Sequence, residues 1–166
     1  MTVIRPAVAD DLRAVRLLLV ATWHDTYDRL FGSEKVTAIT DAWHSLSALA
    51  RGLDRRGHLF LVAETDGAIV GTISATDRGG GLLWVDRLYV SPALQRCGLG
   101  RALLDAALTR APQASEVRLE VERGNAGGLA FYAYCGFSPA GDETTCGGVG
   151  QAIVLKCAVS SFGPRV

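Results

Sequence analysis

The sequence feature that most constrains this chain is a glycine-containing turn between a predicted strand and a predicted helix. The strand spans Leu83–Val90, which is rich in β-branched, aromatic and aliphatic residues, and it ends before Pro92 because proline cannot donate to a sheet ladder. Apolar residues recur at helical spacing after Arg101. The segment Gln95–Gly100 is therefore predicted to be a tight turn that opens a helix.

This turn has the composition of an anion site. Gly98 and Gly100 allow backbone conformations that other residues avoid, and they let the backbone approach a ligand closely. The free N–H groups of a first helical turn point toward one spot. With Arg96 and Arg101 beside them, these groups predict a site suited to a pyrophosphate.

Other glycine-loop motifs fit this turn less well. A dinucleotide-binding fingerprint would need a third glycine where Leu103 stands. A Walker loop would need Gly-Lys-Ser/Thr, whereas Arg101-Ala102 follows Gly100. A glycine pair at a helix start is often only a tight turn, so the pair alone would be weak evidence of a ligand.

Hydrophobic periodicity and turn residues predict the other elements. Strands are predicted at residues 3–6, 58–64, 68–75, 117–121 and 152–155, with Asp66-Gly67 as a hairpin turn. Helices are predicted from Asp10 or Asp11 to Gly32, from Ser33 to between Gly52 and Gly57, and from about Gly128 to Tyr134. Residues 142–148 are predicted to lack a regular element, and residues 160–166 to form a loose tail.

Two of these helices have a predicted buried face. The face of the first consists of Leu12, Val15, Leu19, Thr22 and Thr26. The face of the second, read as one continuous helix, consists of Val36, Ile39, Trp43, Leu46, Ala50 and Leu53.

Composition limits the class of protein. The 166 residues, of which 49% are apolar and 20% charged, suit one globular domain. Lys plus Arg and Asp plus Glu both number 17, so bulk charge predicts neither nucleic-acid nor membrane-surface binding. The four cysteines show no CxxC spacing, and no metal set is expected. No signal peptide is recognised, and no apolar run is long enough to span a membrane. We therefore expect a cytoplasmic protein with reduced thiols.

Two motifs resemble those of the GNAT superfamily of N-acetyltransferases. The first is Gln-x-x-Gly-x-Gly at residues 95–100, after a strand that ends in Tyr-Val-x-Pro and before Arg-Ala-Leu-Leu. The second is Asn125–Phe137, which resembles the family's later motif Asn-x-x-Ala-x-x-Phe-Tyr-x-x-x-Gly-Phe. Their order and separation, together with the predicted elements, extend the resemblance over nearly the whole chain.

The resemblance implies an α+β fold in a single domain over residues 1–166. Its central sheet would be mixed and mostly antiparallel, with about six or seven strands and flanking helices. The fourth and fifth strands would splay apart, and the thioester arm of acetyl-CoA would enter between them.

The resemblance also implies the cofactor-binding residues. The pantetheine arm would pair with the backbone of Leu88–Val90, and the Val90 N–H would donate to the thioester oxygen. Asn125 would approach the pantetheine or cap the helix that follows it. The complete implied set is Leu88, Tyr89, Val90, Gln95, Arg96, Cys97, Gly98, Leu99, Gly100, Arg101 and Asn125.

Catalytic groups follow from the same resemblance. Tyr132 occupies the position of a general acid for the leaving thiolate, with Tyr134 nearby and aromatic packing as the alternative. Asp86 is the candidate general base, directly or through water, and an ion pair with Arg87 or Arg118 is its alternative role. Glu120 is a weaker candidate, and a water chain could replace a single base.

The acceptor side is predicted to include Trp23, His24 and Tyr27. Their spacing resembles a Trp-x-x-x-Tyr pattern in GNAT branches that act on small amines, including polyamines. Packing between helices is the alternative role for the two aromatic residues, and simple surface exposure is the alternative for His24.

The expected activity is transfer of an acetyl group from acetyl-CoA to a primary amine of a small molecule or protein, by direct attack in a ternary complex. A catalytically weak CoA-binding sensor or interaction module is the alternative. No metal, nucleic acid or membrane is expected as a partner, and a homodimer is left open.

Overall fold

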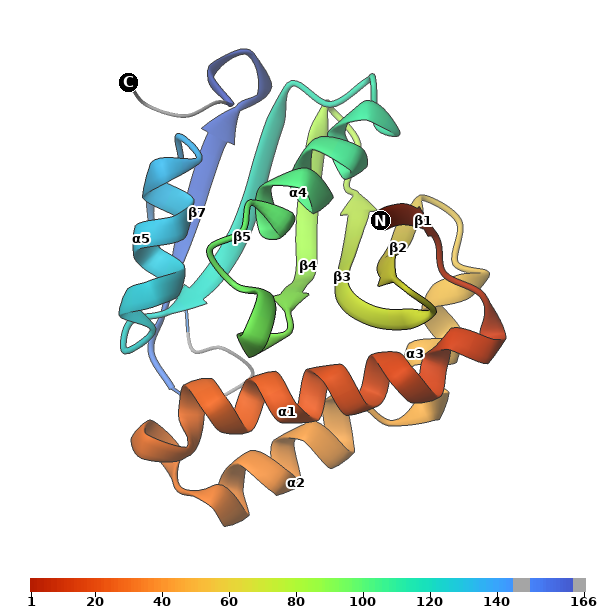
Figure 1. Ribbon diagram of the computed structural model, residues 1–166. Helices are drawn as coiled ribbons and strands as arrows, with labels where there is room; N and C mark the ends of the chain where they lie inside the picture. Colours follow the sequence, from red (N-terminus) through yellow and green to blue (C-terminus); the bar gives the residue numbers. More distant parts are fainter. Residues whose placement is uncertain (145–149, 163–166) are drawn as a thin grey trace. The chain divides into compact units, whose positions relative to one another are not determined.

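The structure is a computed structural model that describes residues 1–144 and 150–162 (Figure 1). The chain divides into two compact units. Unit 1 contains Met1–Ala75 and Arg87–Arg110, and unit 2 contains Thr76–Asp86 and Ala111–Val166. Of the predicted loose tail, residues 160–166, Ser160 and Ser161 belong to a short 3-10 helix, Val159–Ser161, and residues 163–166 lie outside the described residues. Residues 145–148 of the segment predicted to lack an element also lie outside them.

The strands form a seven-stranded sheet in the order β1-β2-β3-β4-β5-β7-β6. β4 and β5 are parallel, whereas the β1–β2, β5–β7 and β6–β7 pairs are antiparallel. This confirms the predicted α+β class and mixed sheet. The bounds are β1 Thr2–Pro6, β2 His58–Thr65, β3 Ala68–Asp77, β4 Leu82–Val90, β5 Glu116–Glu122, β6 Ser138–Thr144 and β7 Ala152–Ala158.

Unit 2 contains the only parallel pair that the described ladders show. β4 pairs with β5 at Leu82–Glu116, Leu83–Val117 and Trp84–Arg118, and the described ladder ends there. β5 continues on its other side, where it pairs with β7 as far as Glu122. An early end to the β4–β5 ladder is what the predicted divergence of these strands requires.

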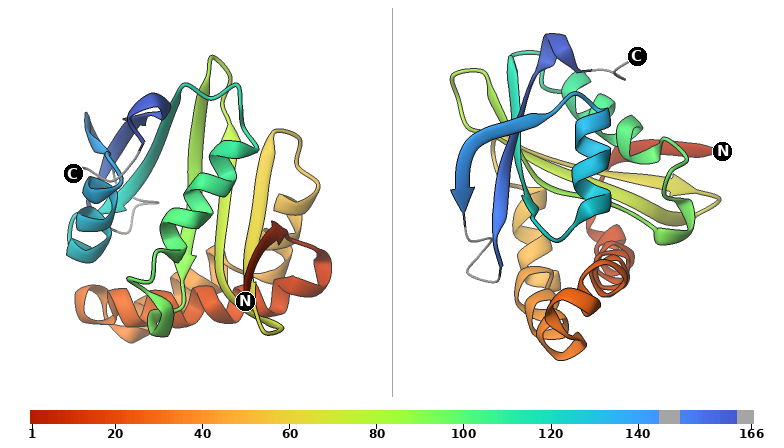
Figure 2. Two further views of the ribbon diagram at one scale, coloured as in Figure 1. Left: turned by 45° about the horizontal axis from the view of Figure 1, so that its top comes forward. Right: turned by 90° about the vertical axis from the view of Figure 1, so that its left-hand side faces the viewer.

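β6 is a strand that the sequence analysis does not predict. Its register with β7 shifts between Pro139 and Glu143, where Gly141 has a φ of 89°. A proline, a glycine and a register shift all interrupt a strand's alternating pattern. The helix α5, Ala126–Tyr134, lies on one side of the unit 2 strands (Figure 2) and starts two residues before the predicted helix.

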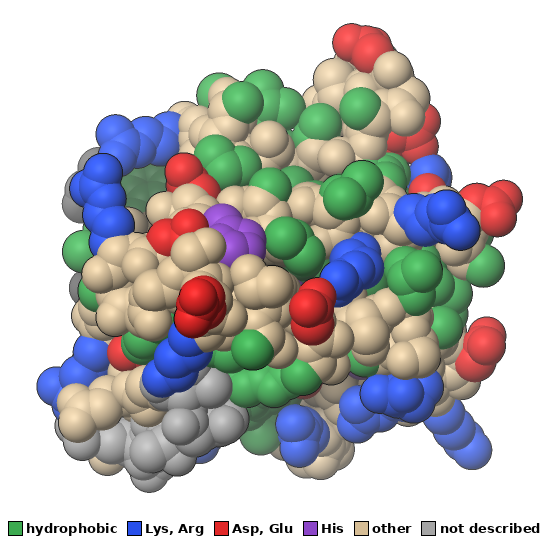
Figure 3. Space-filling model, turned by 90° about the horizontal axis from the view of Figure 1, so that it is seen from below, with side chains coloured by type: hydrophobic (Ala, Val, Ile, Leu, Met, Phe, Trp, Pro, Cys, Tyr) green, Lys and Arg blue, Asp and Glu red, His purple; other side chains and the backbone are tan. Residues whose placement is uncertain are grey.

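Four helices belong to unit 1. They are α1 Leu12–Phe31, α2 Ser33–Trp43, α3 Leu46–Leu53 and α4 Leu99–Thr109. α1–α3 lie on one side of β1–β3, and α4 lies on the other (Figure 2). No helix in the described part of the chain is long and apolar enough to cross a membrane. The outer surface of α1 and α2, seen from below in Figure 3, intersperses basic and acidic side chains.

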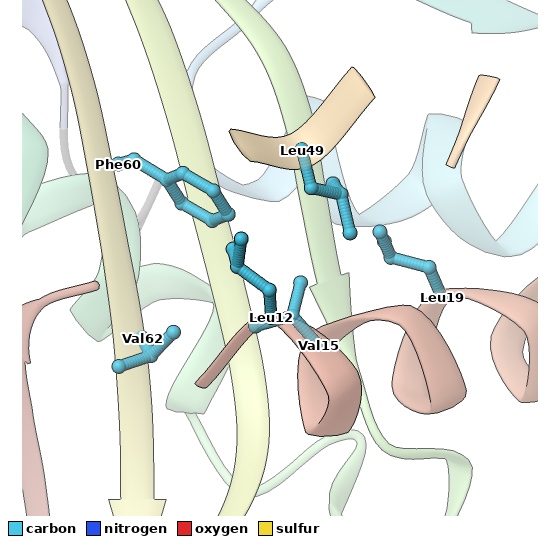
Figure 4. Close-up of a cluster of buried hydrophobic side chains, with 6 residues drawn as sticks. All are labelled: Leu12, Val15, Leu19, Leu49, Phe60 and Val62. Atoms are coloured by element: carbon cyan, nitrogen blue, oxygen red, sulfur yellow. The ribbon is translucent and has the colours of Figure 1, made fainter. Parts of the chain in front are cut away.

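The core beneath α1 and α3 follows from alternation along β2. Phe60 and Val62 point toward these helices and pack in a cluster with residues of α1 and α3 (Figure 4). The helical members of the cluster are Leu12, Val15, Leu19 and Leu49. On the opposite face, a Cβ added at Gly71 would lie 3.0 Å from Leu103 of α4, so α4 packs closely on β3 at that point.

The predicted continuous helix from Ser33 is wrong, because it breaks into α2 and α3. His44 leaves helical geometry (φ −119°, ψ 25°), and the Ser45 hydroxyl accepts a hydrogen bond from the Ala48 N–H at 3.2 Å. This cap starts a new helix with a different buried face. Leu49 is therefore 1% exposed, whereas Leu46, expected inside, is 41% exposed.

Two arginines hold the C-terminal end of α2. Arg16 donates to the carbonyl oxygens of Thr40 (3.3 Å) and His44 (3.0 Å). Arg87 of β4 donates through Nη2 to the Trp43 carbonyl at 3.1 Å. The last carbonyls of a helix lack intrahelical partners and carry partial negative charge, so both guanidinium groups stabilise the break.

His44 at this break is buried and neutral. Its side chain is 3% exposed, and Arg87 donates through Nε to its Nδ1 in a long hydrogen bond of 3.4 Å. Burial, followed by the positive charges of Arg87 and Arg16, lowers the pKa of His44 to about 3. Because Nδ1 accepts, the proton is assigned to Nε2, for which the described residues provide no acceptor.

The start of α1 depends on a different titrating group. Asp11 accepts from the Val8 N–H at 2.8 Å and from both terminal nitrogens of Arg5 at 2.7 and 2.8 Å. The hydrogen bonds from Arg5 lower the pKa of Asp11 below its ordinary value of 3.8. The stabilisation from this pair is therefore present above that value and is lost as pH falls through the lowered pKa.

The helix break can be tested with two leucines. Leu49→Ala should lower the free energy of unfolding by about 2–5 kcal/mol, because it leaves a cavity in the core cluster. Leu46→Ala, the matched control on the exposed side, should change it by less than about 0.5 kcal/mol. Urea unfolding at neutral pH measures both changes. The reverse order would support the continuous helix.

A second test uses the pH dependence of stability. Between the folded pKa of His44, about 3, and the ordinary value of 6.5, only the unfolded chain binds this proton. The free energy of unfolding should fall as pH decreases from about 6.5 to 4.5, with His44 contributing up to about 1.4 kcal/mol per pH unit. His44→Asn removes the titrating group, so its slope should be smaller by about one proton. The stabilisation from Asp11 is lost only at lower pH, so it does not interfere. Equal slopes in wild type and His44→Asn would exclude this account of His44.

Candidate active site

The predicted glycine turn is formed in unit 1 between β4 and α4. A short 3-10 helix, Pro92–Leu94, follows β4, and α4 begins at Leu99 with Gly98 as its N-cap, two residues before the predicted start. Arg96 (φ 63°) and Gly98 (φ 81°) have left-handed backbone geometry. A Cβ added at Gly98 would meet no atom within 4 Å, so this position needs glycine for its backbone angle and opens toward solvent.

The first backbone donors of α4 have no acceptor among the described residues. The hydrogen bonds found in residues 1–144 and 150–162 include none from the N–H groups of residues 98–100, and the Ala102 N–H bonds back to Gly98 at 3.0 Å. Arg96 is exposed beside these donors. Arg101 is half-buried, with its Nε 3.6 Å from Asp105, so part of its charge is balanced locally. The predicted anion site is therefore geometrically plausible.

Gln95 has a local structural role. Its side-chain amide donates to the Val90 carbonyl at 3.3 Å, which ties the turn to the end of β4. Arg87 and Tyr89 both contact His44, so their side chains point toward α2. Alternation along the strand then directs Leu88 to the opposite face. The side chain of Tyr89 is therefore engaged with the helices, whereas the cofactor prediction concerns only its backbone.

Trp23 and Tyr27 form part of an aromatic cluster in unit 1. They are 6% and 8% exposed, their rings lie 4.6 Å apart, and Trp23 donates through Nε1 to the Tyr89 hydroxyl at 3.0 Å. Trp23 also packs edge-on against Trp43 and His44, with both ring centroids 5.7 Å away. The structure thus shows the packing role that was the alternative for both residues.

His24 lies partly exposed between α1 and α2. Its Nδ1 is 2.7 Å from the Asp28 carboxylate, and its Nε2 is 3.4 Å from the Thr37 hydroxyl. Its side chain is 27% exposed. Of the three residues predicted to contact an acceptor, His24 is therefore the most accessible.

The candidate general base lies in unit 2. Asp86 is exposed and accepts from the buried Thr76 hydroxyl at 2.6 Å, which fixes one carboxylate oxygen. Arg118, one of the suggested ion-pair partners, bonds Glu116 on the same strand. Glu120, the weaker candidate, is exposed on β5.

The candidate general acid also lies in unit 2. Tyr132 is half-buried, and its ring packs edge-on against Phe131 and Phe137 at centroid distances of 5.0 and 5.5 Å. Tyr134 is 54% exposed, and residues two apart on a helix point to nearly opposite sides. Asn125 caps α5 by accepting from the Gly128 N–H at 2.9 Å, which was the alternative for that residue.

The remaining predicted groups add no metal chemistry to the described part of the chain. Cys97 is exposed in the turn, whereas Cys135 and Cys157 are buried, and all three are free thiols. Cys146 lies outside the described residues. No cluster of three or more His, Cys, Asp or Glu residues suited to a metal ion occurs among those described.

Sequence reasoning missed the contacts of His44 and Arg87. These residues are separated by 43 positions and meet only because α2 ends beside β4. Ser45, three residues before the N–H that it caps, was the one signal that could have placed the break.

Comparison with known proteins agrees with this geometry. The model of the acetyltransferase (GNAT) family matches residues 18–137. The PaiA N-acetyltransferase of Thermoplasma acidophilum, solved with coenzyme A, is 22% identical, with a TM-score of 0.86 over 95% of this chain and 99% of that one. The ribosomal-protein-S18-alanine N-acetyltransferase of Escherichia coli is also 22% identical, with a TM-score of 0.71 over 100% of this chain and 99% of that one.

A third solved structure shows the same fold over part of its length. The putative streptothricin acetyltransferase of Bacillus anthracis, solved with acetyl coenzyme A, is 18% identical, with a TM-score of 0.59 over 66% of each chain. Identities this low establish a shared fold and no shared substrate. The family model, however, matches well over half of the residues. The chain therefore belongs to the GNAT acetyltransferase family.

Proposed function

We propose that this protein is an N-acetyltransferase that moves the acetyl group of acetyl-CoA to a primary amine of a small molecule or protein. One observation carries the proposal. In a chain of this family, the N–H groups of residues 98–100 lie at the start of α4 without acceptors among the described residues. Such a set of donors favours a bound anion.

The pyrophosphate of acetyl-CoA fits this turn chemically. The positive end of the α4 dipole, the free N–H groups and the exposed Arg96 all favour negative charge, and the open space at Gly98 admits it. Residues 95–101 would hold the pyrophosphate, with Cys97 contributing only its N–H. The backbone of Leu88–Val90 would hold the pantetheine arm, and Asn125 would support it from the start of α5.

Acetyl transfer requires a neutral amine. An alkyl amine has an ordinary pKa of about 10.4, so it is protonated at neutral pH. Asp86, oriented by Thr76, would accept the proton directly or through water. The amine nitrogen then forms a bond to the thioester carbonyl carbon, and the Val90 N–H donates to the oxyanion. The C–S bond breaks, and Tyr132 donates its proton to the departing thiolate. The nitrogen loses its second proton, through water, to the Tyr132 phenolate as the amide forms.

The acceptor would be chosen by the α1–α2 side of unit 1. His24 is the accessible polar group there, and its Asp28 partner adds an acceptor for an ammonium or hydroxyl group. Trp23 and Tyr27 are buried, so they would shape this surface from beneath it. The cofactor side uses mainly backbone atoms, which leaves the choice of amine to these side chains.

The cofactor site can be tested at two exposed helix-capping glycines that share a positive φ but differ in ψ, which is −3° at Gly98 and 145° at Gly32. Gly98→Glu should weaken CoA binding by at least about 100-fold, because it puts a carboxylate where the phosphates would lie. Gly32 is the matched control, since it also has a positive φ (82°), also caps a helix and also has open space around it. Gly32→Glu should leave CoA affinity unchanged. Calorimetry that finds equal affinities in both folded variants would overturn the assignment.

The general acid can be tested at two tyrosines of α5. Tyr132→Phe should lower kcat by about 10–100-fold while CoA affinity holds, because phenylalanine keeps the ring packing and loses only the proton donor. Tyr134→Phe, on the exposed side, should behave as wild type. Thiol release with a panel of primary amines measures both. Full turnover in Tyr132→Phe would return this residue to a packing role.

The same assay separates the two candidate functions. Wild-type protein that binds acetyl-CoA but releases no thiol with any amine would be the CoA-binding module named as the alternative.

A further inference from the structure

A buried link joins β4 to the helices immediately before the segment proposed to hold the thioester. Arg87 donates through Nη2 to the Trp43 carbonyl (3.1 Å) and through Nε to His44 (3.4 Å). Two residues on, the Tyr89 hydroxyl accepts from Trp23 at 3.0 Å. Both side chains that β4 directs toward α1–α3 in this stretch therefore hold a helix.

Stability alone does not account for a histidine at position 44. The ring is 3% exposed between Trp23 and Tyr89, and its Nε2–H lacks an acceptor among the described residues. A buried donor without a partner costs free energy. Phenylalanine would fill a similar space beside these aromatic rings without that cost. The histidine supplies one thing that phenylalanine cannot, which is an acceptor for Arg87.

That acceptor fixes the plane of the guanidinium group. A guanidinium is planar, so bonds at Nε and Nη2 together define its orientation more closely than a bond at Nη2 alone. With both bonds made, Arg87 holds β4 at one position relative to the end of α2. Because Arg87 directly precedes Leu88 in the strand, holding Arg87 in place also fixes the position of the Leu88–Val90 backbone.

We propose that His44 is a positioning residue for acetyl transfer, which through Arg87 sets the Leu88–Val90 backbone against the helices that carry the acceptor side. The inference rests on the proposed function. Reacting atoms must be held within about 3–3.5 Å, and a displacement of about 1 Å can cost 100-fold in rate. The turn proposed to hold the pyrophosphate lies outside this link, so cofactor affinity should depend on the link much less than turnover does.

Two substitutions of His44 separate positioning from packing. His44→Phe keeps the volume but removes the acceptor, so we expect a melting temperature near that of wild type and a kcat at least about tenfold lower. His44→Asn places an amide oxygen near the position of Nδ1 but leaves a cavity, so we expect a lower melting temperature and recovery of most of kcat. His58→Phe, at a half-buried histidine outside the link, should keep wild-type kcat.

The assay is thiol release from acetyl-CoA with an alkyl diamine, an aromatic amine and a peptide with a free N-terminus, below the melting temperature of every variant. CoA affinity by calorimetry should change much less than kcat in all of them. A purely structural role would make kcat follow stability, so a slower Asn variant beside a fully active Phe variant overturns the inference. Wild-type protein that acetylates none of these amines overturns the proposed function, and this inference with it.

Discussion

The structure depends on one backbone constraint, which is the abrupt change from strand β4 to helix α4. The change is made through left-handed geometry at Arg96 and Gly98, and it leaves the first N–H groups of α4 without acceptors among the described residues. A side chain cap would have satisfied one of these donors, but Gly98 has no side chain. The fold therefore exposes the positive end of the α4 dipole, with its N–H groups unsatisfied. This costs free energy unless an anion binds there.

The segments that sequence alone could predict are those with local causes. The β2–β3 hairpin follows from Asp66-Gly67, both of which have positive φ, and α4 follows from apolar spacing after a glycine pair. The break at His44 and Ser45 could not be predicted from periodicity, because apolar residues continue across it at helical intervals. The break is stabilised by Arg16 and Arg87, which come from other elements.

The same distinction applies to the candidate site. The glycine turn proposed to hold the pyrophosphate is contiguous in sequence, so its residues, charges and backbone conformation can be anticipated from one motif. The Trp23–Tyr89 hydrogen bond joins residues 66 positions apart. Trp23 and Tyr27, which the sequence predicts to form an acceptor surface, are therefore mostly buried. Sequence reasoning could not tell a contact surface from helix packing there, because aromatic residues at helical spacing serve both.

The proposed donor and acceptor sites would therefore use different physical means. The proposed cofactor contacts are mainly backbone N–H and C=O groups, and these stay in place when exposed side chains change. The proposed acceptor contacts are side chains of α1 and α2, where substitution changes charge and shape directly. Both sets must nevertheless keep a fixed separation for the amine to reach the thioester. In unit 1 that separation is held by half-buried side chains, Arg87 on the end of α2 and the Tyr89 hydroxyl on Trp23. Such an arrangement allows the acceptor surface to vary while the geometry of transfer is kept.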